Sequence, residues 1–128
     1  MHTPHTTPHL RRGAWRLATV VLLALSMHAA QAMSIRELRA LEKSDRKQGI
    51  NYMRYYLVGV MEGVLQGHAL GTRNGAAPRI CLEGRRLQPA MALDLYQTEL
   101  RRNADLYEAD IPVELVLANA LATVYPCP

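Results

Sequence analysis

Residues 111–128 read IPVELVLANALATVYPCP, and this stretch predicts the last element of the fold. Its apolar residues recur at the i, i+3, i+4, i+7 spacing of a helix with one buried face. They are Val113, Val116, Leu117, Ala120, Leu121 and Val124. Pro112 suits the first turn of a helix, where its missing N–H leaves no acceptor unpaired, and Pro126 ends the helix. The sequence therefore predicts a helix over about 113–124, followed at once by Cys127.

Cys127 can form an intramolecular disulfide only with Cys81, because the chain contains two cysteines. In an oxidising compartment an even number of cysteines favours a disulfide. A bridge from 81 to 127 closes a segment of 47 residues, counting both ends, and loop entropy gives it a stabilisation of roughly 4 kcal/mol. Two free or intermolecular thiols are the alternative, whereas a redox-active pair favours the CxxC spacing that this chain lacks.

The region between the two cysteines predicts one helix and two connectors. A helix is expected from about Gln88, with Pro89 in its first turn and apolar residues on one face. Residues 72–80, TRNGAAPRI, contain Asn-Gly and Pro, which are typical of a loop. Residues 101–110, RRNADLYEAD, are polar and break the helical period, so they form either a helix end or a projecting connector.

Two further helices are expected ahead of Cys81. Ser34 and Glu37 make the capping-box pattern at the start of a helix over about 34–47, and Gly49 ends or bends it. The next helix covers about 50–70 and is rich in Met, Val, Leu and Tyr.

This second helix contains glycines four residues apart, at Gly59, Gly63 and Gly67. The spacing places them along one face of the helix. Each costs about 1 kcal/mol relative to alanine but lets another helix approach closely. Two interpretations stay open, a seam for packing within the chain and a homodimer seam. A membrane-helix dimer is disfavoured, because charged and polar residues such as Arg54 and Glu62 interrupt the segment.

Residues 1–32 have the organisation of a cleaved export signal. Arg11, Arg12 and Arg16 precede a short apolar run, LATVVLLALS, and Ala30-Gln31-Ala32 supplies the small residues of a cleavage site. The run is shorter than the roughly 20 residues of a membrane-spanning helix, although an uncleaved anchor is the alternative. Arg11-Arg12 leaves twin-arginine export open beside the general secretory route. We expect cleavage near Ala32 and a periplasmic location.

Removal of the signal changes the charge and the chemical inventory of the chain. Three of the fifteen basic residues lie in 1–32, which leaves twelve against eleven acidic residues and a net charge of +1. This balance gives no electrostatic reason to expect nucleic acid or membrane partners. Four of the five histidines are also in 1–32, so only His68 remains. No zinc-ligand set, GxSxG motif or phosphate-binding glycine loop is present, and we expect no enzyme activity, metal or cofactor.

The predicted fold is all-α: a small four-helix domain over 33–128, stapled by one disulfide after the signal peptide at 1–32. Several features of this domain, in order, resemble the Rap/Tai family of immunity proteins, which protect bacteria from amidase effectors of type VI secretion systems. They are Tyr56-Leu57-Val58-Gly59-Val60, Ile80-Cys81-Leu82, Leu95 with Leu100, Ile111-Pro112, and Ala120-Leu121 leading to Tyr125-Pro126-Cys127.

The resemblance implies a periplasmic, all-α and often dimeric protein that occludes the active-site groove of a peptidoglycan amidase. The residues that touch the toxin do not follow from it. A plug into a groove is usually a projecting loop with an anchoring side chain. The first candidate is 101–110, with Arg101, Asp105, Leu106, Tyr107 and Glu108 as partner-binding residues. The second is Thr72–Arg79, and either segment is otherwise an ordinary connector.

A different class of function is the alternative. Small periplasmic helical proteins with one disulfide include acid-stress chaperones, which expose apolar surface by loosening at low pH. The eleven carboxylates of the mature chain permit such an acid response. Suppression of aggregation in acid would favour the chaperone, whereas neutralisation of a toxin at neutral pH would favour immunity.

Overall fold

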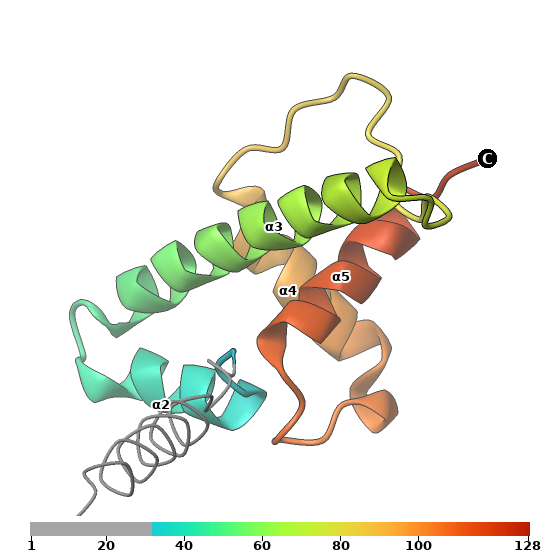
Figure 1. The fold of residues 1–128 in the computed structure, drawn as a ribbon. Helices are drawn as coiled ribbons and strands as arrows, with labels where there is room; N and C mark the ends of the chain where they lie inside the picture. The colour runs from blue at the N-terminus through green and yellow to red at the C-terminus, as the bar shows by residue number, and fades with distance from the viewer. Residues whose placement is uncertain (1–31) are drawn as a thin grey trace, which may run out of the picture. The chain divides into compact units, whose positions relative to one another are not determined.

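The computed structural model describes residues 32–128, so the predicted signal peptide lies, except for Ala32, outside the described residues. Four α-helices follow one another (Figure 1). They are α2 (Ile35–Ser44), α3 (Gly49–Arg73), α4 (Met91–Arg102) and α5 (Val113–Val124), with a one-turn 3-10 helix, η1 (Ala104–Leu106), between the last two. This part of the chain contains no strand, only isolated bridges at Ser34–Pro112 and Ile80–Pro126. The all-α prediction is confirmed.

Helix α5 contributes five buried residues to the core, more than any other helix of residues 32–128. It contacts α3 and α4, and α3 also contacts α2 and α4. Figure 1 shows α3 as the longest element, running across α4 and α5, with α2 near its N-terminal end. The predicted apolar stripe of α5 is buried except at Val124, whose side chain lies at the C-terminal end of the helix and is 45% exposed.

The start of α2 follows from the predicted capping box. The Ser34 hydroxyl accepts a hydrogen bond from the Glu37 N–H at 3.3 Å, and the Glu37 carboxylate accepts one from the Ser34 N–H at 2.7 Å. This backbone N–H stabilises the charged carboxylate and lowers the pKa of Glu37. The hydrogen bonds satisfy N–H groups that have no partner inside the helix.

The junction between α2 and α3 differs by a few residues from the expected one. Helix α2 ends at Ser44, because the Asp45 carboxylate accepts hydrogen bonds from the N–H groups of Lys47 and Gln48 and turns the chain. These two donors lower the pKa of Asp45, with the larger effect from Gln48. Gly49 is buried in this turn and begins α3, which continues to Arg73 rather than ending near residue 70.

The predicted disulfide is present between Cys81 and Cys127, whose Cα atoms are 4.9 Å apart. Next to it the Cys81 N–H donates to the Tyr125 carbonyl at 2.8 Å. The bridge therefore joins the end of α5 to the connector that leads from α3 to α4. Helix α4 begins at Met91, three residues after the expected start at Gln88.

No helix within residues 32–128 has the length and apolar character needed to cross a membrane.

Candidate interaction surface

The connector between α4 and α5 is a short projection attached to α2. Its backbone turns through η1 and then accepts hydrogen bonds from α2: the Ala109 carbonyl from the Arg36 N–H at 2.8 Å and the Ile111 carbonyl from the Ile35 N–H at 3.0 Å. The Arg36 guanidinium also pairs with the Asp110 carboxylate at 3.0 Å. These contacts fix both the path and the base of the projection, which is therefore more than a helix end.

A buried carboxylate braces this projection from inside. Glu99, on α4, is only 4% exposed, and its Oε1 accepts hydrogen bonds from Tyr107 Oη at 2.7 Å and Asn103 Nδ2 at 2.8 Å. Asn119, on α5, donates to the Tyr107 hydroxyl at 3.0 Å. One network thus joins α4, the projection and α5, and buried networks of this kind hold a segment in one conformation.

Arg101 lies in the last turn of α4, and the other four predicted partner-binding residues lie in the connector that follows. Leu106, in η1, is 71% exposed, and Arg101, Asp105 and Glu108 are also exposed. Tyr107 is half-buried and directs its hydroxyl inward to Glu99. Leu106 is therefore the exposed apolar side chain of this segment, and Tyr107 holds the segment in place.

Glu99 and Asn119 are functional residues that the sequence pattern did not single out. A signal for Glu99 was available, because it follows Ala92, Leu95 and Tyr96 on the buried face of α4 at helical spacing. A carboxylate on a buried face needs internal partners.

Burial of three phenols makes the folded chain sensitive to alkali. Burial is the main cause that raises the pKa values of Tyr56, Tyr96 and Tyr107, and the bond to Glu99 adds to the effect at Tyr107. A raised pKa means that these groups favour folding below the unfolded value of about 10, and that this contribution disappears as the pH rises through the folded values. We expect the ultraviolet absorbance of ionised tyrosine to increase above about pH 10, together with the loss of helical circular dichroism. Ionisation of these three phenols without loss of helical circular dichroism would contradict the predicted link between ionisation and unfolding.

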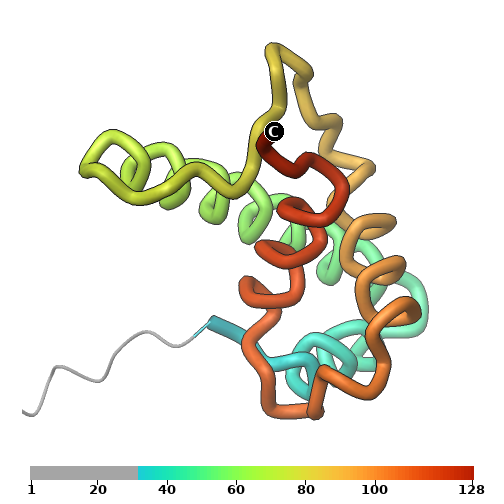
Figure 2. Tube along the Cα trace, turned by 90° about the vertical axis from the view of Figure 1, so that its right-hand side faces the viewer, coloured from blue at the N-terminus to red at the C-terminus, as the bar shows by residue number. Residues whose placement is uncertain are grey.

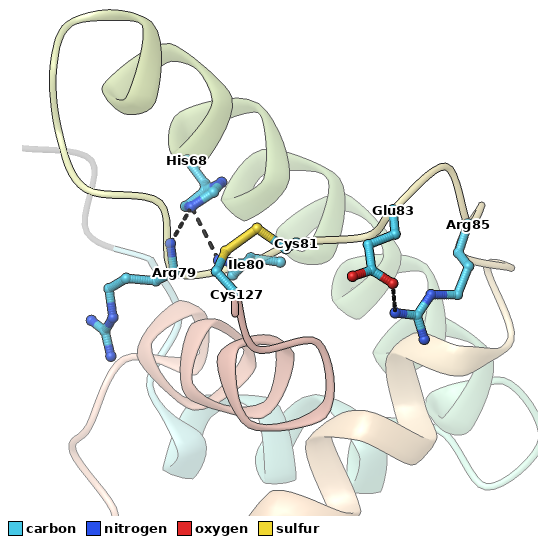
Figure 3. Close-up of a disulfide and its surroundings, with 7 residues drawn as sticks. All are labelled: His68, Arg79, Ile80, Cys81, Glu83, Arg85 and Cys127. Carbon is cyan, nitrogen blue, oxygen red and sulfur yellow. Dashed lines mark hydrogen bonds and ion pairs between the residues drawn. A yellow bond between two sulfur atoms is a disulfide. The ribbon is translucent and has the colours of Figure 1, made fainter.

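The second candidate segment, Thr72–Arg79, belongs partly to α3 and partly to the connector that follows it. Thr72 and Arg73 are the last residues of α3, and the chain then runs from Asn74 to Ala90 without a helix. His68 Nε2 accepts hydrogen bonds from the N–H groups of Arg79 at 3.0 Å and Ile80 at 3.2 Å (Figure 3). An imidazole nitrogen that accepts carries no proton, so this arrangement requires neutral His68.

The tip of the same connector is fixed beside the disulfide. Arg85 forms an ion pair with Glu83 at 3.3 Å (Figure 3). Its guanidinium carbon lies 5.1 Å from the ring centre of Tyr125. Glu83 and Gly84 turn the chain with positive φ angles of 50° and 79°. The connector is therefore held by the disulfide, His68 and Arg85, although most of its residues are exposed.

The two candidate segments lie at opposite ends of the molecule and have opposite charge. Figures 1 and 2 both place the 74–90 connector at one end of α4 and α5 and the η1 projection at the other. Residues 72–79 contain two arginines and no acidic residue, whereas 101–110 contain three acidic residues and two arginines, both in the last turn of α4. The projection therefore fits a basic partner surface and the connector an acidic one.

The glycine row of α3 faces outward. A Cβ atom added at Gly59, Gly63 or Gly67 would meet nothing within 4 Å. The same helix carries three large exposed apolar side chains: Tyr52, Tyr55 and Leu70, at 45%, 78% and 59% exposure. No element of residues 32–128 packs on the glycines, so the close helix packing expected within the chain is not observed there. The intermolecular seam stays a prediction.

Among the described residues no group of three or more His, Cys, Asp or Glu side chains is placed to hold a metal ion. Comparison with protein-family models, curated proteins and solved structures gives no match for this chain.

Proposed function

We propose that this chain is a periplasmic immunity protein that binds a peptidoglycan amidase effector of a type VI secretion system and occludes its active-site groove. The chain itself performs no chemistry in this role. The single observation that carries the proposal is the rigid projection at η1, where an exposed leucine stands on a backbone braced from below. The resemblance of the sequence to the Rap/Tai family supplies the class of partner.

The projection has the physical properties of a plug. Leu106 is 71% exposed, so its burial in a partner groove would remove apolar surface from water. The bonds from Glu99 and Asn119 to Tyr107 fix the segment before binding, which reduces the entropy lost on association. Asp105 and Glu108 flank the leucine and would steer it toward a basic rim.

Export to the periplasm is part of the same proposal. The amidase would attack peptidoglycan, so its inhibitor has to act in the compartment that contains peptidoglycan. The basic and apolar segments of 1–32 supply an export signal, and the Cys81–Cys127 disulfide suits an oxidising compartment.

The test is protection from a toxin, followed by measurement of the complex. The product of the adjacent open reading frame, tested as the amidase, is directed to the periplasm with and without this protein, and lysis is followed. We expect protection by the wild type. In the purified complex, Leu106→Ala should weaken binding by about 30-fold or more, as at a central anchor.

Leu115→Ala is the matched control, because Leu115 is 46% exposed and lies on α5, outside the projection. Both variants should melt close to the wild type, since neither side chain is buried. Toxin binding that Leu106→Ala leaves unchanged would exclude η1 as the plug. Absence of any protection would exclude the immunity function with this amidase.

We further propose that two copies associate through the outer face of α3. The exposed row of Gly59, Gly63 and Gly67 permits close approach of a second helix, and Tyr52 and Leu70 flank it toward the two ends. An antiparallel second copy would set Tyr52 against Leu70 of its partner, because a two-fold interface places the same patch on both subunits. Light scattering across a range of concentrations, with Gly63→Leu as the disrupted variant, measures this association.

An acid-stress chaperone is the second candidate, and the bonding of His68 favours it. The N–H groups of Arg79 and Ile80 both depend on one unprotonated nitrogen, His68 Nε2, so the hold of α3 on the connector rests on a single acceptor. Suppression of the aggregation of a client protein is measured at acid and neutral pH. Activity that is confined to acid, without protection from the amidase, would support this function in place of immunity.

A further inference from the structure

A groove of about 230 Å³ lies between α4 and the C-terminal half of α5. Most of its wall is apolar, and the residues that form this wall are Met91, Leu95, Ala120, Val124 and Tyr125. Four polar side chains of α4 complete the lining: Asp94, Thr98, Glu99 and Arg102. Of the side chains that hold the η1 projection, only Glu99 also lines this groove.

Glu99 is a buried charge with an incomplete set of partners. Both of its hydrogen bonds, from Asn103 and Tyr107, go to Oε1, and both donors are neutral. Within residues 32–128 its other oxygen, Oε2, makes no hydrogen bond, and no cationic nitrogen lies within 4 Å of the carboxylate. Oε2 keeps some solvent-accessible surface, so a donor that enters the groove can reach it although the residue as a whole is 96% buried.

We infer that the α4–α5 groove binds a cationic group on an apolar stem, such as the arginine or lysine side chain of a partner protein. Oε2 of Glu99 would accept the charged hydrogen bond, which is stronger than a bond between neutral groups. Leu95, Val124 and Tyr125 would contact the methylene stem, as apolar surfaces commonly do for these two residues. The charge of the groove agrees, because Asp94 and Glu99 outweigh Arg102.

Arg102 is a cation of this chain that would compete with an external cation for the Glu99 carboxylate. It lines the same groove three residues after Glu99, but its guanidinium forms no ion pair with that carboxylate. Loss of the Arg102 charge should therefore strengthen binding of an external cation. An anion-binding groove would show the opposite response.

The inference does not depend on the amidase, because a small probe tests it directly. n-Butylguanidinium is titrated into the full mature protein, and backbone amide shifts are followed by NMR. We expect saturable shifts centred on Leu95, Val124 and Tyr125, with affinity in the millimolar range. n-Butanol, which has the stem without the charge, should bind at least about tenfold more weakly, since a charged hydrogen bond contributes about 1.5–3 kcal/mol.

Three variants decide the assignment. Glu99→Gln keeps an acceptor for the Tyr107 hydroxyl, and it should weaken the binding of n-butylguanidinium at least about tenfold. Glu62→Gln removes the same charge from an exposed position on α3, outside the groove, and should leave binding unchanged. Val124→Trp fills the mouth of the groove without touching the carboxylate, and it should block the probe even if Glu99→Gln fails to fold.

Equal binding of n-butanol and n-butylguanidinium would overturn the inference, because the groove would then select only apolar surface. Shifts that spread over the molecule without saturation, or that survive Val124→Trp, would overturn it as well. Strengthened binding in Arg102→Gln supports it. These outcomes are independent of toxin protection, so the inference and the proposed function can fail separately.

Discussion

Replacement of Cys81 and Cys127 by serine together should lower the free energy of unfolding by about 4 kcal/mol and the melting temperature by roughly 15–30 °C. The bridge spans a sequence separation of 46, so it restricts the unfolded chain strongly. The domain is small, and small domains retain only a modest excess of stability. Calorimetry of the oxidised wild type and the double variant measures the difference.

The reduced wild type and the double serine variant form a matched pair for this prediction. Both should melt at nearly the same temperature, and reductant should change only the wild type. Oxidised and reduced wild type that melt alike would contradict the prediction, because the disulfide would then contribute nothing to the stability of the fold.

The disulfide and the proposed plug should respond differently to reduction. The bridge holds the connector between α3 and α4 to the end of α5, whereas Glu99, Tyr107 and Asn119 hold the η1 projection. The 74–90 connector and the η1 projection lie at opposite ends of α4 and α5 (Figure 2). Well below its melting temperature, the reduced protein should therefore keep a preformed η1 projection.

The sequence predicted the parts of the fold that depend on local chemistry and apolar period. The capping box at Ser34 and the buried stripe of α5 lie where the pattern placed them. The pairing of Cys81 with Cys127 followed from their number. Helix ends were less accurate, since Asp45 ends α2 through side-chain bonds to Lys47 and Gln48 that its residue type alone does not specify.

The sequence predicted which segment forms the candidate site, but it did not predict how the side chains of that site are arranged. The break in helical period marked 101–110 as a helix end or a connector; Arg101 and Arg102 end α4, and Leu106 is exposed in the connector that follows. The inward direction of Tyr107 depends on Glu99 and Asn119, which come from two different helices. Residue spacing within one helix does not reveal which side chains of two different helices will be in contact.

Glycines of α3 should respond to alanine with opposite signs. A Cβ atom at Gly49 would overlap the Glu42 carbonyl group, which is backbone and cannot rotate away. We expect Gly49→Ala to lower the free energy of unfolding by about 3 kcal/mol, as overpacking of a buried site does. Denaturant unfolding followed by circular dichroism measures this loss. An unchanged midpoint would mean that the α2–α3 turn can open enough to accept a methyl group.

Gly63→Ala is the matched substitution, because a Cβ atom at Gly63 meets nothing within 4 Å. In a monomer it should stabilise the chain by about 0.5–1 kcal/mol, since alanine favours the helix and the site has space. In the proposed dimer the same methyl group would stand where the second helix approaches. The gain should then be present at low protein concentration and shrink or reverse as the concentration rises. A gain independent of concentration would leave these exposed glycines without a role in association, and the proposed seam on α3 would be wrong.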